Sequence, residues 1–354
     1  MKRIDRAVAK LLEFKLERAV GGSGVAAVDV ILVELEDSDG ARGLGFSYVL
    51  GGGGELPFVA AERQLERFIR GKAPPPPRAT WQNIARSFNR TGFGPNLIGL
   101  AAVDVALWDI HARRQAVPLG VAMGGENRSI SVYGSGCFNT LQTPEEAAEA
   151  AAGHVSRGMR AVKPRVAGVP KDAQVLTAVR KAVGDEVILM ADANEKCDLP
   201  RAHRLIQIAK DHGALFVEEP LPWSAGAAYS MLKAEGITIA GGEHAQDYSQ
   251  LISMMRDGLL TVVQPDLAMI GGLTPIVDIS IVADALGATV SPHFLPGLFV
   301  HVGAVSQSIR WLEEFPLLEQ LFEGWPPIDE GTIAMPTSIG HGLSLSDRAI
   351  TLLK

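Results

Sequence analysis

The sequence predicts an α/β protein in which a (β/α)8 (TIM-like) barrel follows an N-terminal α+β domain. The length of 354 residues exceeds one average domain but fits a barrel of up to about 250 residues plus a small domain. Apolar residues make up 47% of the chain, which is enough for a large core. From residue 130 onward, short β-branched runs alternate with helical segments, a pattern typical of parallel βα units.

The first third of the chain has a different pattern. Residues 26–36 (AAVDVILVELE) predict a strand, residues 37–40 (DSDG) a turn, and residues 41–50 a returning strand. Residues 98–115 carry apolar side chains at helical spacing and predict the strongest helix of this part. A hairpin followed by helices indicates a small α+β domain.

The remainder of the chain contains eight candidate strands. They are residues 130–134, 160–165, 187–192, 214–218, 237–241, 261–265, 288–292 and 309–313. Helical segments lie between most of them, as expected for eight βα units closing into a barrel. In such a barrel the active site lies at the carboxyl ends of the strands.

Seven consecutive candidate strands end in, or are closely followed by, ionisable residues. These are Lys163 with Arg165, Asp192, Glu218, Glu243, Asp266, His293 and Glu313. A single acid at a strand end is most often solvated or caps a helix. An ionisable residue at the strand end of seven consecutive units instead predicts that these residues share one site.

Three of these residues, Asp192, Glu218 and Glu243, follow adjacent strands. Three converging carboxylates cannot all remain ionised without a cation, and carboxylate oxygens suit a hard ion such as Mg²⁺. Lys163 and Arg165 are two positions apart on one candidate strand, and since successive side chains of a strand point to opposite faces, these two share a face. Two like charges on a buried face need anions nearby to compensate them. We expect that a substrate carboxylate and the acids of the site do so.

Asp266 and His293 follow neighbouring strands. A carboxylate bound to one imidazole nitrogen fixes the tautomer and raises the basicity of the other nitrogen. We therefore expect His293 to be a general base or acid. For His203, His212 and His301 we expect ordinary core positions instead.

The overall composition excludes several other functions. The net charge of −7 and the absence of a basic cluster argue against a nucleic-acid partner. Cys137 and Cys197 lie sixty residues apart, which gives no zinc-binding spacing. The charged N-terminus has no apolar core of a secretory signal, and no apolar run is long enough to span a membrane. We expect a cytoplasmic protein, a small-molecule carboxylate as partner, and a homo-oligomer.

The chain resembles the enolase superfamily, and most closely its mandelate racemase subgroup. The resemblance covers nearly the whole chain and depends on a set of motifs that are specific only together: AAVDVALWDIHARRQAVPLGVAMGG, GMRAVKPRV, MADAN, FVEEP, GGEH, QPDLAMIGGLTP, SPHF and WLE. It implies a capping domain, expected at residues 1–125, and a modified barrel without a regular eighth helix at 126–325. Residues 326–354 are expected to pack back on the capping domain. It also implies Mg²⁺ and removal of the proton α to a carboxylate, with an enediolate that the metal stabilises.

The motifs also imply roles for individual residues. Asp192, Glu218 and Glu243 resemble the metal ligands, Asn194 a substrate contact, Asp266 and His293 the catalytic dyad, and Glu313 a donor near the carboxylate. Lys163 matches the lysine that polarises the carboxylate. The muconate lactonizing subgroup has a lysine at the position of Asp266, so the aspartate favours the mandelate racemase side.

Arg165 departs from the racemase pattern, which has a second lysine there that acts as a base. The guanidinium of arginine keeps its proton in proteins, so Arg165 is a poor base and two-base racemisation is disfavoured. We expect dehydration of an acid sugar or another hydroxy acid to a 2-keto-3-deoxy acid. A racemase or epimerase of a 2-hydroxy acid and a non-catalytic binding barrel stay open as alternatives.

Overall fold

The computed structural model describes residues 3–353, and its N-terminal part is a three-stranded antiparallel sheet. The strands lie in the order β1 (Ile4–Val20), β2 (Val25–Asp37) and β3 (Arg42–Leu50). The hairpin of β2 and β3 confirms the expected pair of strands. β1 was not predicted, although Leu12 and Phe14 are buried and the residues between and after them are exposed, as a period of two requires.

Helices cover one face of this sheet. They are α1 (Glu55–Gln64), continued by a π-helical turn at Leu65–Ile69, α2 (Pro77–Arg86), continued by a 3-10 turn at Ser87–Arg90, and α3 (Pro95–Gln115). α3 contains the helix predicted at residues 98–115. It packs directly on β3 because Gly45 has no side chain: a Cβ there would lie 2.1 Å from the carbonyl oxygen of Ala102.

The second part is a barrel of parallel strands, and each predicted strand region overlaps one of them. They are β4 (Ser129–Gly134), β5 (Ala161–Val162), β6 (Ile188–Asp192), β7 (Ala214–Glu218), β8 (Thr238–Gly241), β9 (Val262–Val263), β10 (Thr289–Val290) and β11 (Trp311–Glu314). β4 to β10 pair in sequence order, and β11 pairs with β4. A bridge between Val290 and Ile309 joins the last two strands and closes the barrel.

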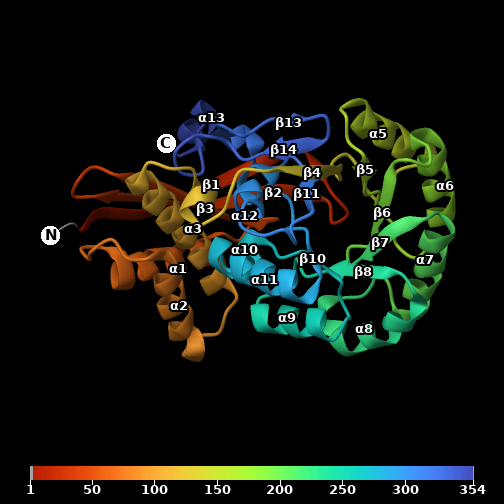
Figure 1. The fold of residues 1–354 in the computed structure, drawn as a ribbon, viewed down its shortest axis with the longest axis horizontal. Coiled ribbons are helices and arrows are strands. Elements are labelled where there is room, and N and C mark those ends of the chain that lie inside the picture. The colour runs from red at the N-terminus through yellow and green to blue at the C-terminus, as the bar shows by residue number, and fades with distance from the viewer. Residues whose placement is uncertain (1–2, 354) are drawn as a thin grey trace.

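Helices surround the barrel, as Figure 1 shows for α5 to α8 outside β5 to β8. The helices of this part are α4 (Leu119–Ala122), α5 (Pro144–Ser156), α6 (Lys171–Val183), α7 (Leu199–Asp211), α8 (Gly226–Leu232), α9 (Tyr248–Arg256), α10 (Leu267–Ile270), α11 (Leu273–Leu286) and α12 (Pro296–Gly303). Within residues 3–353, β11 is followed by a 3-10 turn at Glu319–Leu321 and no α-helix until α13 (Asp347–Leu352). The barrel is therefore modified, without a regular eighth helix.

The C-terminal segment contacts the N-terminal sheet. It contains two short antiparallel pairs, β12 (Phe322–Glu323) with β15 (Ser344–Leu345) and β13 (Ile328–Asp329) with β14 (Thr332–Ala334). The guanidinium of Arg348 lies 4.9 Å from the ring centre of Phe14, and the rings of Phe322 and Phe46 are 4.5 Å apart. The exact domain limits stay a prediction.

No helix within the described residues is long and apolar enough to cross a membrane.

Candidate active site

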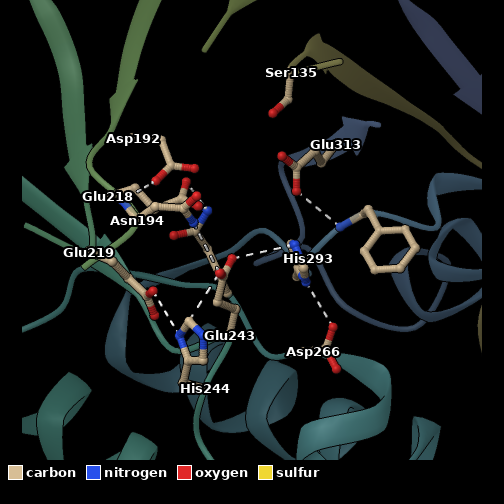
Figure 2. A network of polar contacts seen from close by, with 12 residues as sticks. Ser135, Asp192, Asn194, Glu218, Glu219, Glu243, His244, Asp266, His293 and Glu313 are labelled. Atoms are coloured by element: carbon tan, nitrogen blue, oxygen red, sulfur yellow. Dashed lines mark hydrogen bonds and ion pairs between the residues drawn. The ribbon is translucent and has the colours of Figure 1, made fainter. Parts of the chain in front are cut away.

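The ionisable residues predicted from the strand ends lie at the carboxyl ends of the barrel strands. Asp192 and Glu218 end β6 and β7 and are paired in register, and Glu243 lies two residues after β8. Asp266 caps α10 after β9, and His293 follows β10. Figure 2 shows the side chains of Asp192, Glu218, Glu243, His293 and Glu313 around one common space. The structure thus brings the predicted residues to one site.

Lys163 lies at the bottom of this site and is fully buried. Its Nζ is 2.6 Å from Glu218 Oε2, 2.9 Å from Glu313 Oε1 and 3.5 Å from Asp192 Oδ2. Burial alone would favour the neutral amine, but the carboxylates of Glu218 and Glu313 outweigh it and raise the pKa of Lys163 above its usual range. Lys163 is therefore a fixed positive charge.

Arg165, two residues after Lys163, faces the same site. Its backbone forms a bridge with Asp192, and its Nη1 contacts Asp192 Oδ2. Its Nη2 lies 3.5 Å from Ser135 Oγ, and its guanidinium is 5.9 Å from the ring centre of Phe315. The two cations share a buried face, as the alternation of strand residues predicts, and each of them is paired with carboxylates.

The three predicted metal ligands do not form the tightest acidic cluster in the described part of the chain. Among residues 3–353, the group whose ligand atoms lie within 4.8 Å of one another is Glu195, Glu219 and His244. His244 Nδ1 lies 2.9 Å from Glu219 Oε2, so that this group is already partnered internally.

Asp192, Glu218 and Glu243 nevertheless fit a hard divalent cation by their chemistry. They offer carboxylate oxygens from three adjacent strand ends, the donor type that Mg²⁺ takes in proteins. Asp192 Oδ2 is buried and is held by cationic side chains, not by hydrogen-bond donors of the backbone. Asn194 lies beside them, with Nδ2 3.5 Å from Glu243 Oε1.

The turn between β1 and β2 lies over this acidic side of the site. Lys196 Nζ donates to the carbonyl oxygen of Gly22. A Cβ at Gly22 would lie 2.1 Å from Asn194 Oδ1, so that a larger residue there would displace the Asn194 side chain. The N-terminal domain therefore contributes a wall to the site.

His293 and Asp266 form the predicted pair. His293 Nδ1 lies 2.8 Å from Asp266 Oδ2, and its Nε2 faces the acidic side, 3.4 Å from Glu243 Oε2 (Figure 2). Burial lowers the pKa of His293, but the Glu243 carboxylate and the hydrogen bond to Asp266 raise it to about 10 overall. The nitrogen that points into the site is thus the one that Asp266 leaves free.

Glu313 fixes the backbone next to this pair. Its Oε2 accepts the N–H of Phe294 at 3.0 Å, and Phe294 and Leu295 have positive φ angles of 33° and 53°. Burial would raise the pKa of Glu313, but Lys163, His293 and Arg165 lower it below its usual range. Glu313 is therefore an anion between the two cations and the histidine. In this state it only accepts hydrogen bonds and is not the donor near the carboxylate that the resemblance implied.

Sequence reasoning missed several residues of the site. Gln264 donates to Glu218 Oε2 at 2.6 Å, and Glu219 pairs with His244. Both belong to motifs already quoted, QPD and FVEEP, and their positions at strand ends are the signal that could have found them. Tyr48, which donates to Asp266 at 2.5 Å, is 218 positions away from it, and no spacing rule reaches that far.

Two expectations for histidines outside the site are wrong. His203 and His212 are half-buried, not core, because they lie on the outer surface of the helical layer, where His203 pairs with Glu235 and His212 contacts Thr177. His301 is fully buried, as expected.

Family models match both parts of the chain. Residues 145–349 match the model described as enolase C-terminal domain-like. Residues 15–124 match the N-terminal domain of mandelate racemase and muconate lactonizing enzyme. The chain belongs to the enolase superfamily, in its mandelate racemase subgroup.

Curated and solved members of the superfamily are similar over nearly the whole chain. The L-talarate/galactarate dehydratase of Salmonella typhimurium is 30% identical over 331 residues, which cover 91% of this chain and 82% of the relative. The crystal structure of the L-talarate dehydratase of a Polaromonas species, complexed with Mg and L-glucarate, superposes with a TM-score of 0.91 at 29% identity, covering 99% of this chain and 97% of that one. A racemase of Streptomyces coelicolor with bound magnesium gives a TM-score of 0.89 at 27% identity, with 99% of each chain covered.

Proposed function

We propose that this protein removes the proton α to the carboxylate of an acid sugar and dehydrates the molecule to a 2-keto-3-deoxy acid, with Mg²⁺ as cofactor. The observation that carries the proposal is the asymmetry of the site. A histidine with one free nitrogen faces it from the β10 side, and an arginine instead of a second base faces it from the β5 side.

Asp192, Glu218 and Glu243 are the residues that we assign to the metal. When bound, Mg²⁺ supplies positive charge that stabilises the negative charge developing on the substrate carboxylate. The magnesium reported in the Polaromonas dehydratase and the Streptomyces racemase supports this assignment.

Lys163 and Arg165 bind and polarise the substrate anion in this proposal. Both side chains are charged and buried, so solvent screens their attraction to the substrate carboxylate only weakly. Lys163 is held in place by Glu218 and Glu313, and its charge favours the transition state, in which the carboxylate gains electron density. Arg165 offers a planar pair of donors, which suits a carboxylate or vicinal hydroxyls.

His293 carries the proton. Mg²⁺ held by Glu243 would cancel the carboxylate charge that raises the pKa of His293, so that the imidazole would be neutral when the substrate binds. Its Nε2 then accepts the α-proton as the C–H bond breaks, and Asp266 on Nδ1 keeps the tautomer in which Nε2 is free. The same imidazolium then gives its proton to the β-hydroxyl as the C–O bond breaks, so that water leaves. The enol that remains takes a solvent proton at C3, releases its hydroxyl proton to solvent and becomes the 2-keto acid. One acid–base residue suffices because both transfers occur on one face.

Epimerisation of a 2-hydroxy acid is the second candidate, and the similarity to the Streptomyces racemase favours it. It normally needs a base on each face of the α-carbon. Arg165 is a poor base, since a guanidinium keeps its proton in proteins. A non-catalytic binding barrel is less well supported, because every residue predicted for the ligands and the dyad is present.

We also propose that the protein is cytoplasmic. Both cysteines are free, as is usual in a reducing cytoplasm. We also propose that the protein forms a homo-oligomer. Light scattering after gel filtration gives the oligomeric state.

A screen tests the proposal directly. The protein is incubated with Mg²⁺ and a panel of aldonic and aldaric acids, including the talarate, galactarate, gluconate and arabinonate named for the relatives, and 2-keto acid is measured by reaction with semicarbazide. We expect at least one acid to give 2-keto acid that disappears with EDTA. Inversion of an acid without 2-keto acid would support the epimerase instead.

A further inference from the structure

We infer that Tyr48 of the N-terminal domain is a positioning residue for the dyad: its hydroxyl holds Asp266 in the orientation that aims His293 at the substrate. The role in turnover rests on the proposed function, but the contact itself does not. A residue of the N-terminal domain would then take part in the chemistry of the barrel.

The hydrogen bonds of Asp266 carry the inference. Its Oδ2 accepts the Tyr48 hydroxyl at 2.5 Å and also faces His293 Nδ1 at 2.8 Å. Its Oδ1 accepts the backbone N–H groups of Ala268 and Met269, each at 2.9 Å. The two backbone donors anchor one oxygen to the start of α10, so that Tyr48 is the partner that fixes the oxygen used by His293.

The buried hydroxyl of Tyr48 keeps its proton and donates a hydrogen bond to Asp266. Tyr48 is 2% exposed, and desolvation together with the charge of Asp266 raises its pKa well above the usual range, so that the phenol keeps its proton. An ionised carboxylate accepts and does not donate. The direction of the bond is therefore fixed, from Tyr48 to Asp266.

The ring of Tyr48 packs against the same segment that carries the base. Its centre is 4.9 Å from that of Phe294, and the ring of Phe294 is 4.8 Å from the imidazole of His293. Tyr48 lies in β3, where its backbone is paired with Val30 of β2. The sheet of the N-terminal domain thereby supports both members of the dyad.

The opposing interpretation is a buried tyrosine that merely satisfies its hydroxyl. That interpretation predicts a loss of stability and no specific effect on His293. A positioning role predicts instead that kcat falls while substrate binding is retained, because the alignment of imidazole and carboxylate matters in the transition state.

Tyr48→Phe removes the hydroxyl and keeps the ring. We expect kcat to fall about 10- to 100-fold, the range typical for partners that orient a reactive group, with KM changed less than about twofold. The matched control is Tyr229→Phe, which also removes a buried hydroxyl; that hydroxyl donates at 2.7 Å to the carbonyl oxygen of Leu221 and not to Asp266. We expect a similar loss of stability and an unchanged kcat.

A second measurement needs no substrate. With ¹⁵N-labelled histidine, the imidazole signals of His293 are assigned by their loss in His293→Asn, and Tyr48→Phe should shift these signals and not those of the other seven histidines. Tyr229→Phe should leave them in place. Unchanged His293 signals, or an equal loss of kcat in both tyrosine variants, would overturn the inference. Shifted signals in a protein inactive on every acid would support the contact and contradict the proposed function instead.

Discussion

The two sides of the site are built on different principles. On the β10 side, His293 is oriented by hydrogen bonds: Asp266 holds it, and backbone amides and Tyr48 hold Asp266. On the β5 side, Lys163 and Arg165 are held by ion pairs with carboxylates. Hydrogen bonds fix a direction, which a proton transfer needs, whereas clustered charges fix an electrostatic potential, which an anion needs. The site is thus suited to proton transfer on one face and to charge stabilisation on the other.

Removing His293, the proposed base, should have the largest effect. His293→Asn is expected to lower kcat by about 10³-fold, because general acid–base catalysis typically contributes 10²- to 10⁴-fold. His203→Asn is the control, since His203 lies outside the site and pairs with Glu235. Steady-state kinetics measure both variants, and thermal unfolding checks that both are folded. More than a tenth of the activity left in His293→Asn would contradict the role of His293.

The charged side is tested next through the metal. Glu243→Gln should weaken Mg²⁺ binding at least about tenfold, or 1.4 kcal/mol, because it removes one of three proposed carboxylates. Titration calorimetry with Mg²⁺ alone measures this without substrate. Glu323→Gln, an exposed carboxylate of β12, should bind as the wild type does. Equal affinity in Glu243→Gln would remove Glu243 from the ligand set.

A change at Arg165 sharpens the comparison of the two faces. Arg165→Lys keeps the positive charge but introduces a group that can lose its proton. We expect kcat for dehydration to fall about tenfold, since the paired donors are lost, and slow α-proton exchange to appear from the second face. NMR of substrate recovered from D₂O measures that exchange. Undiminished dehydration would show that the planar donors of Arg165 are not needed.

The last prediction concerns stability and contrasts His293 with His301, a histidine outside the site. Burial and the neighbouring His341 lower the pKa of His301 to about 4, so that the folded protein holds it neutral. Below pH 6.5 the unfolded chain binds a proton that the folded chain does not, so stability falls as pH drops from about 6.5 to 4. The contribution is at most about 3 kcal/mol.

Urea unfolding at several pH values tests this effect. His301→Gln, which does not titrate, should show a smaller loss of stability between pH 6.5 and pH 4.5 than the wild type, whatever its stability at pH 7. Parallel curves for the two proteins would mean that other groups carry the acid sensitivity.

The sequence predicted the barrel and most of the site because both follow a local repeat. Each βα unit places the carboxyl end of its strand at the same end of the barrel. Asp192, Glu218 and Glu243 could therefore be located from their positions at the ends of successive candidate strands. The contact between Tyr48 and Asp266 has no such signal, because it depends on how two domains pack. The pairing of Arg165 with Asp192 also needed the structure, since a strand pattern fixes a face and not a partner.

The central claim, dehydration by a single base, is tested most directly by turnover of an active acid in D₂O with Mg²⁺. The account predicts a 2-keto-3-deoxy acid with one solvent deuterium at C3, delivered when the enol becomes the ketone. It also predicts that remaining substrate keeps its configuration at the α-carbon. Recovery of inverted, α-deuterated substrate without any 2-keto acid would contradict the account and establish epimerisation.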